Sequence, residues 1–202
     1  YCFSAFDNII QKHKVEKIKT IGDAYMCAGG LPVLNYTHAK DVVKAALEMR
    51  DFMRNRKKEK EAKGEIPFEL RIGIHTGPVV SGIVGIKKFQ YDIWGDTVNL
   101  AARMESSSDA GKVNISRNTY ELVKNDFNCE YRGKIAAKNK EVIEELGYQP
   151  TIKDALMPNT KTSLNKTRCE RSQHLCVAPT FIKNDKALWA IVDLTSLKIA
   201  GI

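Results

Sequence analysis

Apolar residues recur along the chain with spacings that change between helical and extended periods. Positions 3, 6, 9 and 10 are apolar and lie on one face of a helix, which predicts an amphipathic helix over residues 3–13. A longer stripe over residues 39–53 predicts a second helix, for which Thr37 is a candidate N-cap. The charged run over residues 54–65 mixes both signs, so we expect a solvated helix end and loop there.

Extended patterns alternate with these helices. Residues 15–28 are rich in β-branched and apolar side chains and are interrupted by Gly22-Asp23, which predicts a β-hairpin. Further strands are expected over residues 68–75, 79–85, 89–94, 113–115 and 129–137, and shorter helices over residues 97–105 and 118–123. Strands interleaved with helices predict an α/β (α+β) sandwich with a mixed, mostly antiparallel sheet flanked by helices.

The residue composition of the sequence changes near residue 147. A length of 202 residues with 43% hydrophobic content fits one compact domain, expected over residues 1–147. Residues 141–146 have a helix-like composition, and residues 148–174 are expected to be a linker. Residues 175–202 are left unassigned, with apolar runs that suggest β segments of another domain. Because the chain opens inside a predicted helix and lacks an initial Met, we expect a fragment of a longer protein.

Composition narrows the class of protein. A net charge of +8 suits a nucleoside triphosphate, nucleic acid or an anionic membrane equally well. Nucleic acid is not favoured, because the basic residues are scattered and no pair of exposed aromatics is evident on adjacent strands. Five widely spaced cysteines suggest a reducing, cytoplasmic location. With no run of eighteen apolar residues and no signal peptide, membrane attachment is expected only through regions outside this chain.

Two long segments carry a family resemblance. Residues 15–26 (VEKIKTIGDAYM) and 91–106 (YDIWGDTVNLAARMES) resemble signatures of class III nucleotide cyclase catalytic domains, most closely those of adenylate cyclases. The likeness covers residues 3–138. It implies a ferredoxin-like βαββαβ core whose first strand would precede residue 1, and conversion of ATP to cyclic AMP and pyrophosphate with two Mg²⁺ or Mn²⁺ ions. It further implies a homodimer, with the sites at the subunit interface.

The resemblance also assigns roles to residues on the hairpin and the strand near residue 92. Asp23 would be one of two metal-binding aspartates; the other would lie on the absent first strand, and Asp193 is too weak a substitute to rely on. Lys19 would donate to adenine N1, and Asp92 would accept from the exocyclic amine. This pairing is physically sensible, because guanine presents the reverse pattern on the equivalent edge. Without the resemblance, a Gly-Asp turn is usually only a turn and a strand lysine is ordinarily solvated.

Three further residues are expected to hold the ribose and the phosphates. Asn99 and Arg103 are four residues apart and share a helix face, which otherwise suggests only an exposed polar surface. By resemblance, Asn99 orients the ribose and Arg103 stabilises charge on the α-phosphate, whereas Lys138 grips the terminal phosphates. An arginine suits its role because the planar guanidinium stays charged and can bridge two oxygens.

Other features and other functions remain open at this level. The glycines between residues 73 and 85 fit neither the dinucleotide nor the P-loop spacing, so we expect hairpin and packing roles for them. His75 is expected to make a structural hydrogen bond. The alternatives to an adenylate cyclase are a guanylate cyclase and a catalytically incompetent nucleotide-binding module of the same family.

Overall fold

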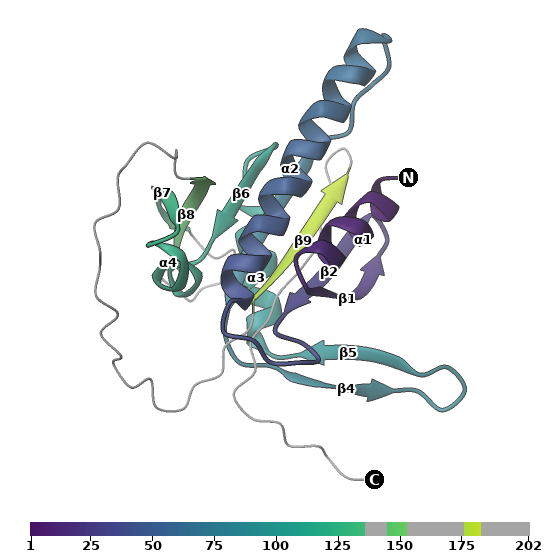
Figure 1. The fold of residues 1–202 in the computed structure, drawn as a ribbon, viewed down its shortest axis with the longest axis vertical. Helices are drawn as coiled ribbons and strands as arrows, with labels where there is room; N and C mark the ends of the chain where they lie inside the picture. The colour runs from purple at the N-terminus through teal and green to yellow at the C-terminus, as the bar shows by residue number, and fades with distance from the viewer. Residues whose placement is uncertain (136–144, 153–175, 183–202) are drawn as a thin grey trace.

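The computed structural model describes residues 1–135, 145–152 and 176–182 (Figure 1). The helices are α1 (Cys2–Lys12), α2 (His38–Ala62), α3 (Asp96–Ser106) and α4 (Arg117–Val123). The strands are β1 (Val15–Ile21), β2 (Ala24–Gly29), β3 (Leu70–Thr76), β4 (Val80–Val84), β5 (Gln90–Trp94), β6 (Lys112–Ile115), β7 (Phe127–Ile135), β8 (Glu145–Ile152) and β9 (Cys176–Ile182).

Seven of these strands form one sheet in the order β1-β2-β9-β3-β6-β8-β7, and β4 pairs with β5 in a separate hairpin. The β3–β6 pair is parallel, and the other paired strands are antiparallel. This confirms the predicted mixed, mostly antiparallel sheet flanked by helices. The chain order α1, β1, β2, α2, β3 agrees with the expected core from its first helix onward.

The region after residue 144 differs from the expectation. The helix predicted over residues 141–146 is wrong for Glu145 and Leu146, which begin β8, and the remainder of that stretch lies outside the described residues. β8 pairs along most of its length with β7, so long-range pairing outweighs the local helix preference. Residues 148–152 of the expected linker belong to this strand. β9, from the unassigned tail, lies in the same sheet between β2 and β3.

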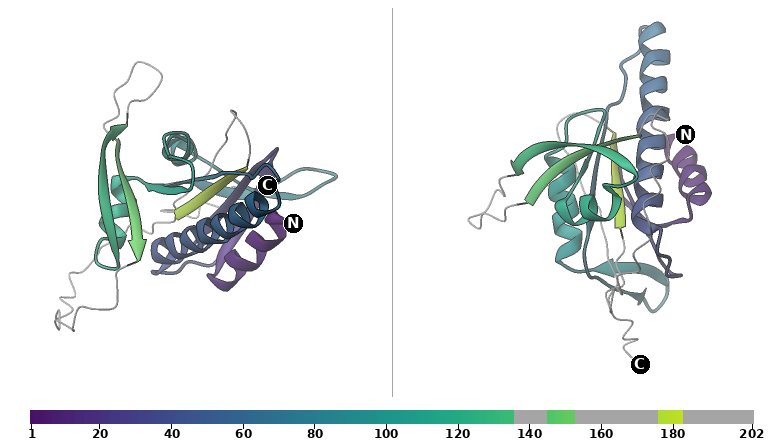
Figure 2. Two further views of the ribbon diagram at one scale, coloured as in Figure 1. Left: turned by 90° about the horizontal axis from the view of Figure 1, so that it is seen from above. Right: turned by 60° about the vertical axis from the view of Figure 1, so that its left-hand side comes forward.

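The sheet has a helical layer on each face (Figure 2). Strand β2 is buried along its whole length, and its side chains alternate between the two faces. Tyr25 and Cys27 belong to the main core with α1 and α2, whereas Met26 and Ala28 belong to a smaller cluster that includes Ala101 of α3. The smaller cluster lies beside the hairpin that carries the predicted site.

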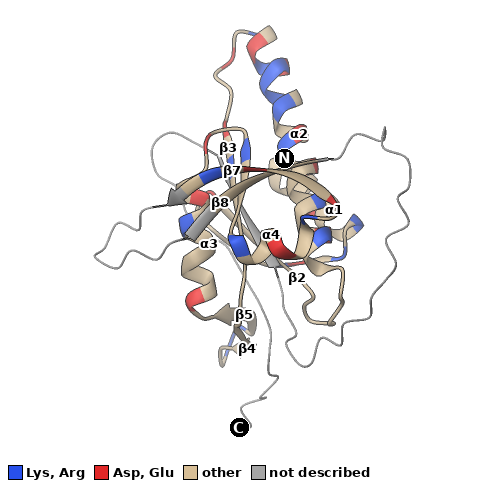
Figure 3. Ribbon diagram, turned by 90° about the vertical axis from the view of Figure 1, so that its left-hand side faces the viewer, with Lys and Arg blue, Asp and Glu red and all other residues tan. Residues whose placement is uncertain are grey.

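Helix α2 is longer than the apolar stripe suggested. It continues through the charged run to Ala62, and its outer half carries many basic side chains (Figure 3). Ion pairs one turn apart stabilise that half, for example Arg56 with Glu59 at 2.8 Å. Thr37 occupies the N-cap position but makes no capping hydrogen bond; its hydroxyl donates to the carboxylate of Asp41 at 2.6 Å.

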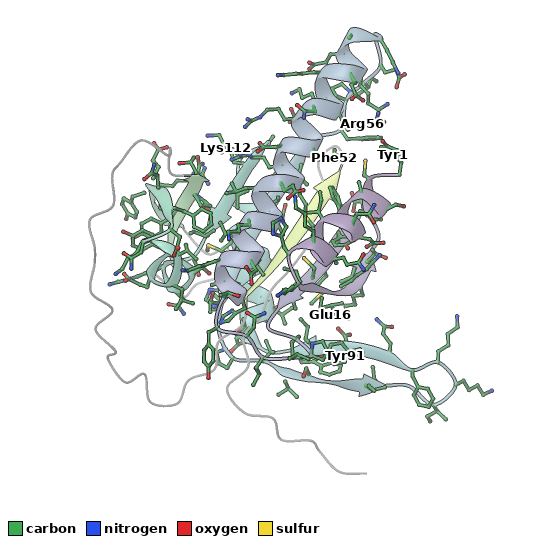
Figure 4. The ribbon with its side chains drawn as sticks, viewed as in Figure 1. Tyr1, Glu16, Phe52, Arg56, Tyr91 and Lys112 are labelled. Atoms are coloured by element: carbon green, nitrogen blue, oxygen red, sulfur yellow. The ribbon has the colours of Figure 1, made fainter. Side chains whose placement is uncertain are left out.

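The first helix is held against α2 by aromatic contacts. The rings of Tyr1 and Phe52 stack with centroids 6.4 Å apart, and the guanidinium of Arg56 lies 4.7 Å from the Tyr1 ring (Figure 4). These contacts hold the N-terminal end of α1 against α2. None of the helices in the described ranges has the length and apolarity that crossing a membrane requires.

Candidate functional site

The structure brings the two predicted base-contacting residues together from distant parts of the sequence. Lys19 lies on β1 and Asp92 on β5, and the Lys19 Nζ atom is 2.5 Å from Asp92 Oδ2. The side chains are 27% and 10% exposed, so the pair is largely shielded from water. The other carboxylate oxygen of Asp92 accepts a hydrogen bond from the backbone N–H of Ile93 at 2.9 Å. The carboxylate is therefore fixed in orientation, and its charge is matched.

A cavity of about 600 Å³ adjoins this ion pair. Lys19 and Asn99, two of the predicted site residues, contribute to its wall. The other lining residues come from the same hairpin and from the β5–α3 segment: Ile21, Met26, Ile93, Trp94, Gly95, Asp96 and Val98. The cavity thus has apolar walls and a few polar groups at its edge, which is the usual character of a small-molecule site. Its size is sufficient for a purine nucleoside.

The turn from β5 into α3 fixes one wall of the cavity. Gly95 has φ of +143°, a conformation that residues with a Cβ rarely adopt. A Cβ at that position would also lie 3.0 Å from the carbonyl oxygen of Pro78. At the second residue of α3, the hydroxyl of Thr97 donates to the same Pro78 oxygen at 2.6 Å. The close approach of these two segments sets the direction in which α3 leaves the site.

Helix α3 carries the remaining described site residues. Asn99 is exposed and borders the cavity, whereas Arg103 follows one turn later and is half-buried. The predicted helix over residues 97–105 is confirmed, with bounds of Asp96–Ser106. Lys138 and Asp193 lie outside the described residues.

Asp23 occupies the turn between β1 and β2 and is half-buried, at the end of the same hairpin that carries Lys19. Within the described ranges, no group of three His, Cys, Asp or Glu side chains could hold a metal ion. The sequence of β9, CVAPTFI, contains no carboxylate. A second aspartate beside Asp23, which the resemblance implies, stays a prediction.

An acidic side chain that the sequence analysis did not single out lies near Asp23. Glu105, on α3, is 1% exposed, and one of its carboxylate oxygens is 3.2 Å from Nε of Arg71. Burial raises the pKa of Glu105 from 4.5 to about 7; Arg71 opposes this rise, and the charge of Asp23 adds to it. Its position follows from close packing, because a Cβ on Gly73 of β3 would lie 2.0 Å from the backbone nitrogen of Glu105.

His75 has a structural role, as expected. Its Nδ1 atom is 2.8 Å from the hydroxyl of Ser116, which is the N-cap residue of α4. Burial lowers the pKa of His75 from 6.5 to about 4, so the ring is neutral at physiological pH.

The sequence analysis did not name the apolar residues that line the cavity, although two of them could have been predicted. Ile93 and Trp94 directly follow Asp92, so the sequence already placed them near this carboxylate, which is predicted to contact the base. Met26 is the cross-strand partner of Lys19 across a register shift in the hairpin. That irregularity follows from backbone pairing and has no signal in the sequence.

Comparison with known proteins gives a consistent family. Residues 1–149 match the model of the adenylate and guanylate cyclase catalytic domain. The chain is 41% identical over 141 residues to an adenylate cyclase of Mycobacterium tuberculosis, which covers 70% of this chain and 31% of the relative. It is 44% identical over 144 residues to guanylate cyclase 2G of Rattus norvegicus, covering 68% of this chain and 13% of the relative. The chain thus spans about a third or less of these relatives.

A solved structure supports the same fold. The guanylate cyclase domain of RhGC from Catenaria anguillulae, crystallised in complex with GTP, has a TM-score of 0.66 and 34% sequence identity to this chain. The match covers 76% of this chain and 81% of that domain. Matches to proteins named for adenine and for guanine substrates therefore occur together, and base preference has to be argued from the site.

Proposed function

The chain belongs to the family of adenylate and guanylate cyclase catalytic domains, and from this we propose that it converts ATP to 3′,5′-cyclic AMP and pyrophosphate. In this reaction the ribose 3′-oxygen forms a bond to the α-phosphorus. The bond from that phosphorus to the bridging oxygen of the β-phosphate breaks, and pyrophosphate leaves with its electron pair. The hydroxyl proton passes to water.

The observation that carries the preference for adenine is the Lys19–Asp92 pair, with its 2.5 Å contact beside the cavity. An ammonium group can donate only, and a carboxylate can accept only, which matches adenine N1 and the exocyclic amine respectively. Guanine would oppose a donor to Lys19 and an acceptor to Asp92. Each buried polar group left unpaired in this way costs on the order of 1 to 3 kcal/mol.

The ion pair also implies a step before binding. In the structure Lys19 and Asp92 satisfy each other, so a base that contacts both has to separate them. The backbone N–H of Ile93 continues to hold one oxygen of Asp92 at 2.9 Å, so we expect Lys19 to move and the carboxylate to stay in place. Adenine replaces the lost contact with two hydrogen bonds, whereas guanine does not.

The other proposed roles follow the geometry of α3 and the hairpin turn. Asn99, at the cavity wall, orients the ribose, and Arg103 stabilises the charge that develops on the α-phosphate. Asp23 contributes one ligand to Mg²⁺ or Mn²⁺, which activates the attacking oxygen when bound. The second carboxylate is not among the described residues, so we assign no individual step to the metal.

We further propose that two copies of the chain form a homodimer with sites at the interface. The β4–β5 hairpin extends from the domain and exposes large apolar side chains, including Ile83 at 70%, Ile86 at 95% and Phe89 at 78%. An exposed apolar surface of this kind is typical of an interaction site. In the dimer, Asp23 of one protomer and Arg103 of the other act on the same triphosphate.

Exchange of the base-contacting pair tests the substrate assignment. We expect Lys19→Glu combined with Asp92→Cys to lower the ratio of kcat/KM for ATP over GTP by about 100-fold, the equivalent of about 3 kcal/mol. Lys44→Glu makes the same substitution as Lys19→Glu on an exposed position of α2 and should leave the ratio unaltered. An unchanged ratio in the double variant would refute the assignment to adenine.

A nucleotide-binding module without turnover is the second candidate, because no group of three His, Cys, Asp or Glu side chains in the described ranges could hold a metal ion. Cyclic AMP formation and ATP binding by the same preparation, with Mn²⁺ present, distinguish the two. Binding without product, under conditions where a cyclase of this family is active in parallel, would support the module.

A further inference from the structure

Strand β1 contains one residue more than its partner strand β2 needs. From the hairpin turn, residues 19–21 pair in register with residues 24–26 of β2. The register then skips Ile18, and Lys17 pairs with Cys27. Ile18 is therefore the extra residue of a β-bulge, a feature that bends a strand and changes the direction of the side chains next to it.

The bulge separates two lysines that would otherwise share a face. In a regular strand, Lys17 and Lys19 would lie on the same face because side chains alternate. Here Lys17 lies on the face of α1, with its Nζ atom 5.1 Å from the centroid of the Tyr25 ring. Lys19 lies on the opposite face, where it lines the cavity together with Met26. Ile18 is 8% exposed and belongs to the same apolar cluster as Met26, so the extra residue is buried on the cavity side.

Three side chains hold the half of β1 that precedes the bulge. Asp7 of α1 accepts a hydrogen bond from the Tyr25 hydroxyl at 2.5 Å. The Lys17 Nζ atom lies 2.7 Å and 2.9 Å from the two carboxylate oxygens of Asp7. Tyr25 is fully buried, so its hydroxyl needs an acceptor, which Asp7 supplies. Burial raises the pKa of Tyr25 and the hydrogen bond to Asp7 raises it further, so the hydroxyl keeps its proton. We call Asp7, Lys17 and Tyr25 the α1 clamp.

A regular ladder is the alternative pairing that the α1 clamp opposes. In that ladder Ile18 would pair with Cys27, and Lys17 would move to the cavity face. Backbone pairing favours this arrangement, because the extra residue of a bulge is left unpaired. Lys17 cannot move to the cavity face while its Nζ atom contacts Asp7. The α1 clamp therefore keeps the extra residue at position 18.

The direction of Lys19 matters most when the site is occupied. In the structure, the 2.5 Å contact with Asp92 holds the Lys19 side chain. A base that contacts both side chains has to open this contact. The direction of Lys19 then depends on the backbone that carries it, and so on the bulge at Ile18.

We propose that the α1 clamp is a positioning device for base recognition: it keeps the bulge at Ile18, and the bulge directs Lys19 toward the base. Lys17 and Asp7 act through Lys19 and do not touch the nucleotide themselves. The inference rests on the proposed contact between Lys19 and the base, and it extends the determinants of specificity from the cavity to helix α1.

Base preference is the first readout, because a general loss of structure lowers the turnover of ATP and GTP together. We expect Lys17→Met to lower the ratio of kcat/KM for ATP over GTP by about tenfold, since Lys19 is the donor that suits adenine and opposes guanine. Lys17→Arg keeps a charge next to Asp7 and should restore the ratio to within about threefold of the wild type. Stability should change little, because Lys17 and Asp7 are 38% and 45% exposed.

Lys12→Met is the matched control. Lys12 lies on α1, and its Nζ atom is 2.9 Å from a carboxylate oxygen of Glu48 on α2. The control therefore removes the same charge and one ion pair of α1, but it leaves the contacts between α1 and the hairpin in place. Its ratio of kcat/KM for ATP over GTP should stay within about twofold of the wild type.

A deletion separates the effect of the α1 clamp from that of the bulge. Removing Ile18 leaves Lys17 opposite Cys27 and Lys19 opposite Met26 in a regular ladder, so both lysines keep their faces while the bulge disappears. We expect the deletion to lower the ratio by about tenfold as well. Adding Lys17→Met to the deletion should lower it no further, because the α1 clamp then has no bulge to hold.

Chemical labelling tests the position of Lys19 without nucleotide. The reactivity of the Lys19 amine toward a small acylating reagent is measured by mass spectrometry, with Lys40, which pairs with Asp126 at 2.8 Å, as the internal reference. We expect this reactivity to rise in Lys17→Met and to stay constant in Lys12→Met. The result does not depend on turnover, so it is separate from the proposed function. A wild type that makes no cyclic AMP, or that prefers GTP, would count against the proposed function instead.

An unchanged ratio in Lys17→Met, equal losses of kcat/KM for ATP and GTP, or an unchanged reactivity of Lys19 would overturn the proposal. A further tenfold loss on adding Lys17→Met to the deletion would also overturn it, because the α1 clamp would then act by a route other than the bulge. If the deletion variant does not fold, the comparison of Lys17→Met with Lys17→Arg and Lys12→Met still decides.

Discussion

Replacing the buried carboxyl of Glu105 with an amide should change how stability depends on pH. Glu105 is 1% exposed, and burial raises its pKa from 4.5 to about 7. In the unfolded chain the carboxyl ionises near its ordinary value, so between these two pH values the folded protein holds more protons. Stability contributed by this group is therefore greatest at low pH and falls as pH rises through the window.

The size of the effect follows from the two pKa values. A rise from 4.5 to about 7 corresponds to about 3 kcal/mol at about 1.4 kcal/mol per pH unit. About 2.5 kcal/mol of this lies between pH 5 and pH 8, because the unfolded carboxyl is already partly ionised at pH 5. The value of about 7 includes the opposing effect of Arg71 at 3.2 Å, so the ion pair does not compensate for the burial.

The assay is urea unfolding of wild type and Glu105→Gln at a series of pH values from 5 to 8. We expect the difference in free energy of unfolding, variant minus wild type, to increase by about 2.5 kcal/mol from pH 5 to pH 8. A constant difference between the two proteins that is already present at pH 5 does not affect this increase. His75, whose pKa burial lowers to about 4, destabilises both proteins equally as pH falls below 6.5, so the comparison cancels its contribution.

An exposed glutamate on β7 provides the matched control, since Glu130→Gln should follow the wild-type curve throughout. Parallel curves for wild type and Glu105→Gln, within about 0.5 kcal/mol at every pH, would contradict the raised pKa and with it the buried, charged environment next to Asp23.

Three further outcomes are expected. Arg103→Ala should lower kcat for cyclic AMP formation by about 100-fold or more with KM within about threefold, and equal losses in kcat and in binding would count against a transition-state role. Inactive Arg103→Ala and Asp23→Ala chains, mixed in equal amounts, should recover about a quarter of wild-type activity, because half of random dimers are mixed and each has one intact site; no recovery would exclude shared sites. Gly73→Ala should destabilise the fold by at least about 3 kcal/mol in thermal or urea unfolding, since the added Cβ would lie 2.0 Å from the backbone of Glu105. The control Gly82→Ala, with its Cβ at 3.8 Å from the nearest side chain, should cost under about 1 kcal/mol, and similar losses for both would contradict the packing argument.

The local elements were predictable because their signals are local. Apolar periodicity predicted α1, the β1–β2 hairpin and α3 to within about two residues of their observed bounds. The charged half of α2 was the exception among the helices. A run of mixed charges is compatible with a loop or a helix. Ion pairs between side chains one turn apart favour the helix, but only when a long apolar stripe has already started it.

The candidate site was predictable only in part. The sequence motifs named Lys19, Asp92 and Asn99, and these lie around one cavity or directly beside it. The raised pKa of Glu105 was not predictable from the sequence. It depends on burial, and this burial requires the absence of a side chain at Gly73, a residue distant in sequence. The position of Met26 in the cavity wall was not predictable either, because it depends on the register of β1 against β2.

By itself the sequence determined the family and most elements before residue 136, since these depend on periodicity and on short motifs, and it predicted the candidate site residues. What only the tertiary structure decided is which of them meet. The 2.5 Å contact between β1 and β5, the enclosure of Glu105 and the position of β9 between β2 and β3 all join segments far apart in the chain. Such contacts are set by how whole strands and helices pack, and local sequence carries little information about that packing.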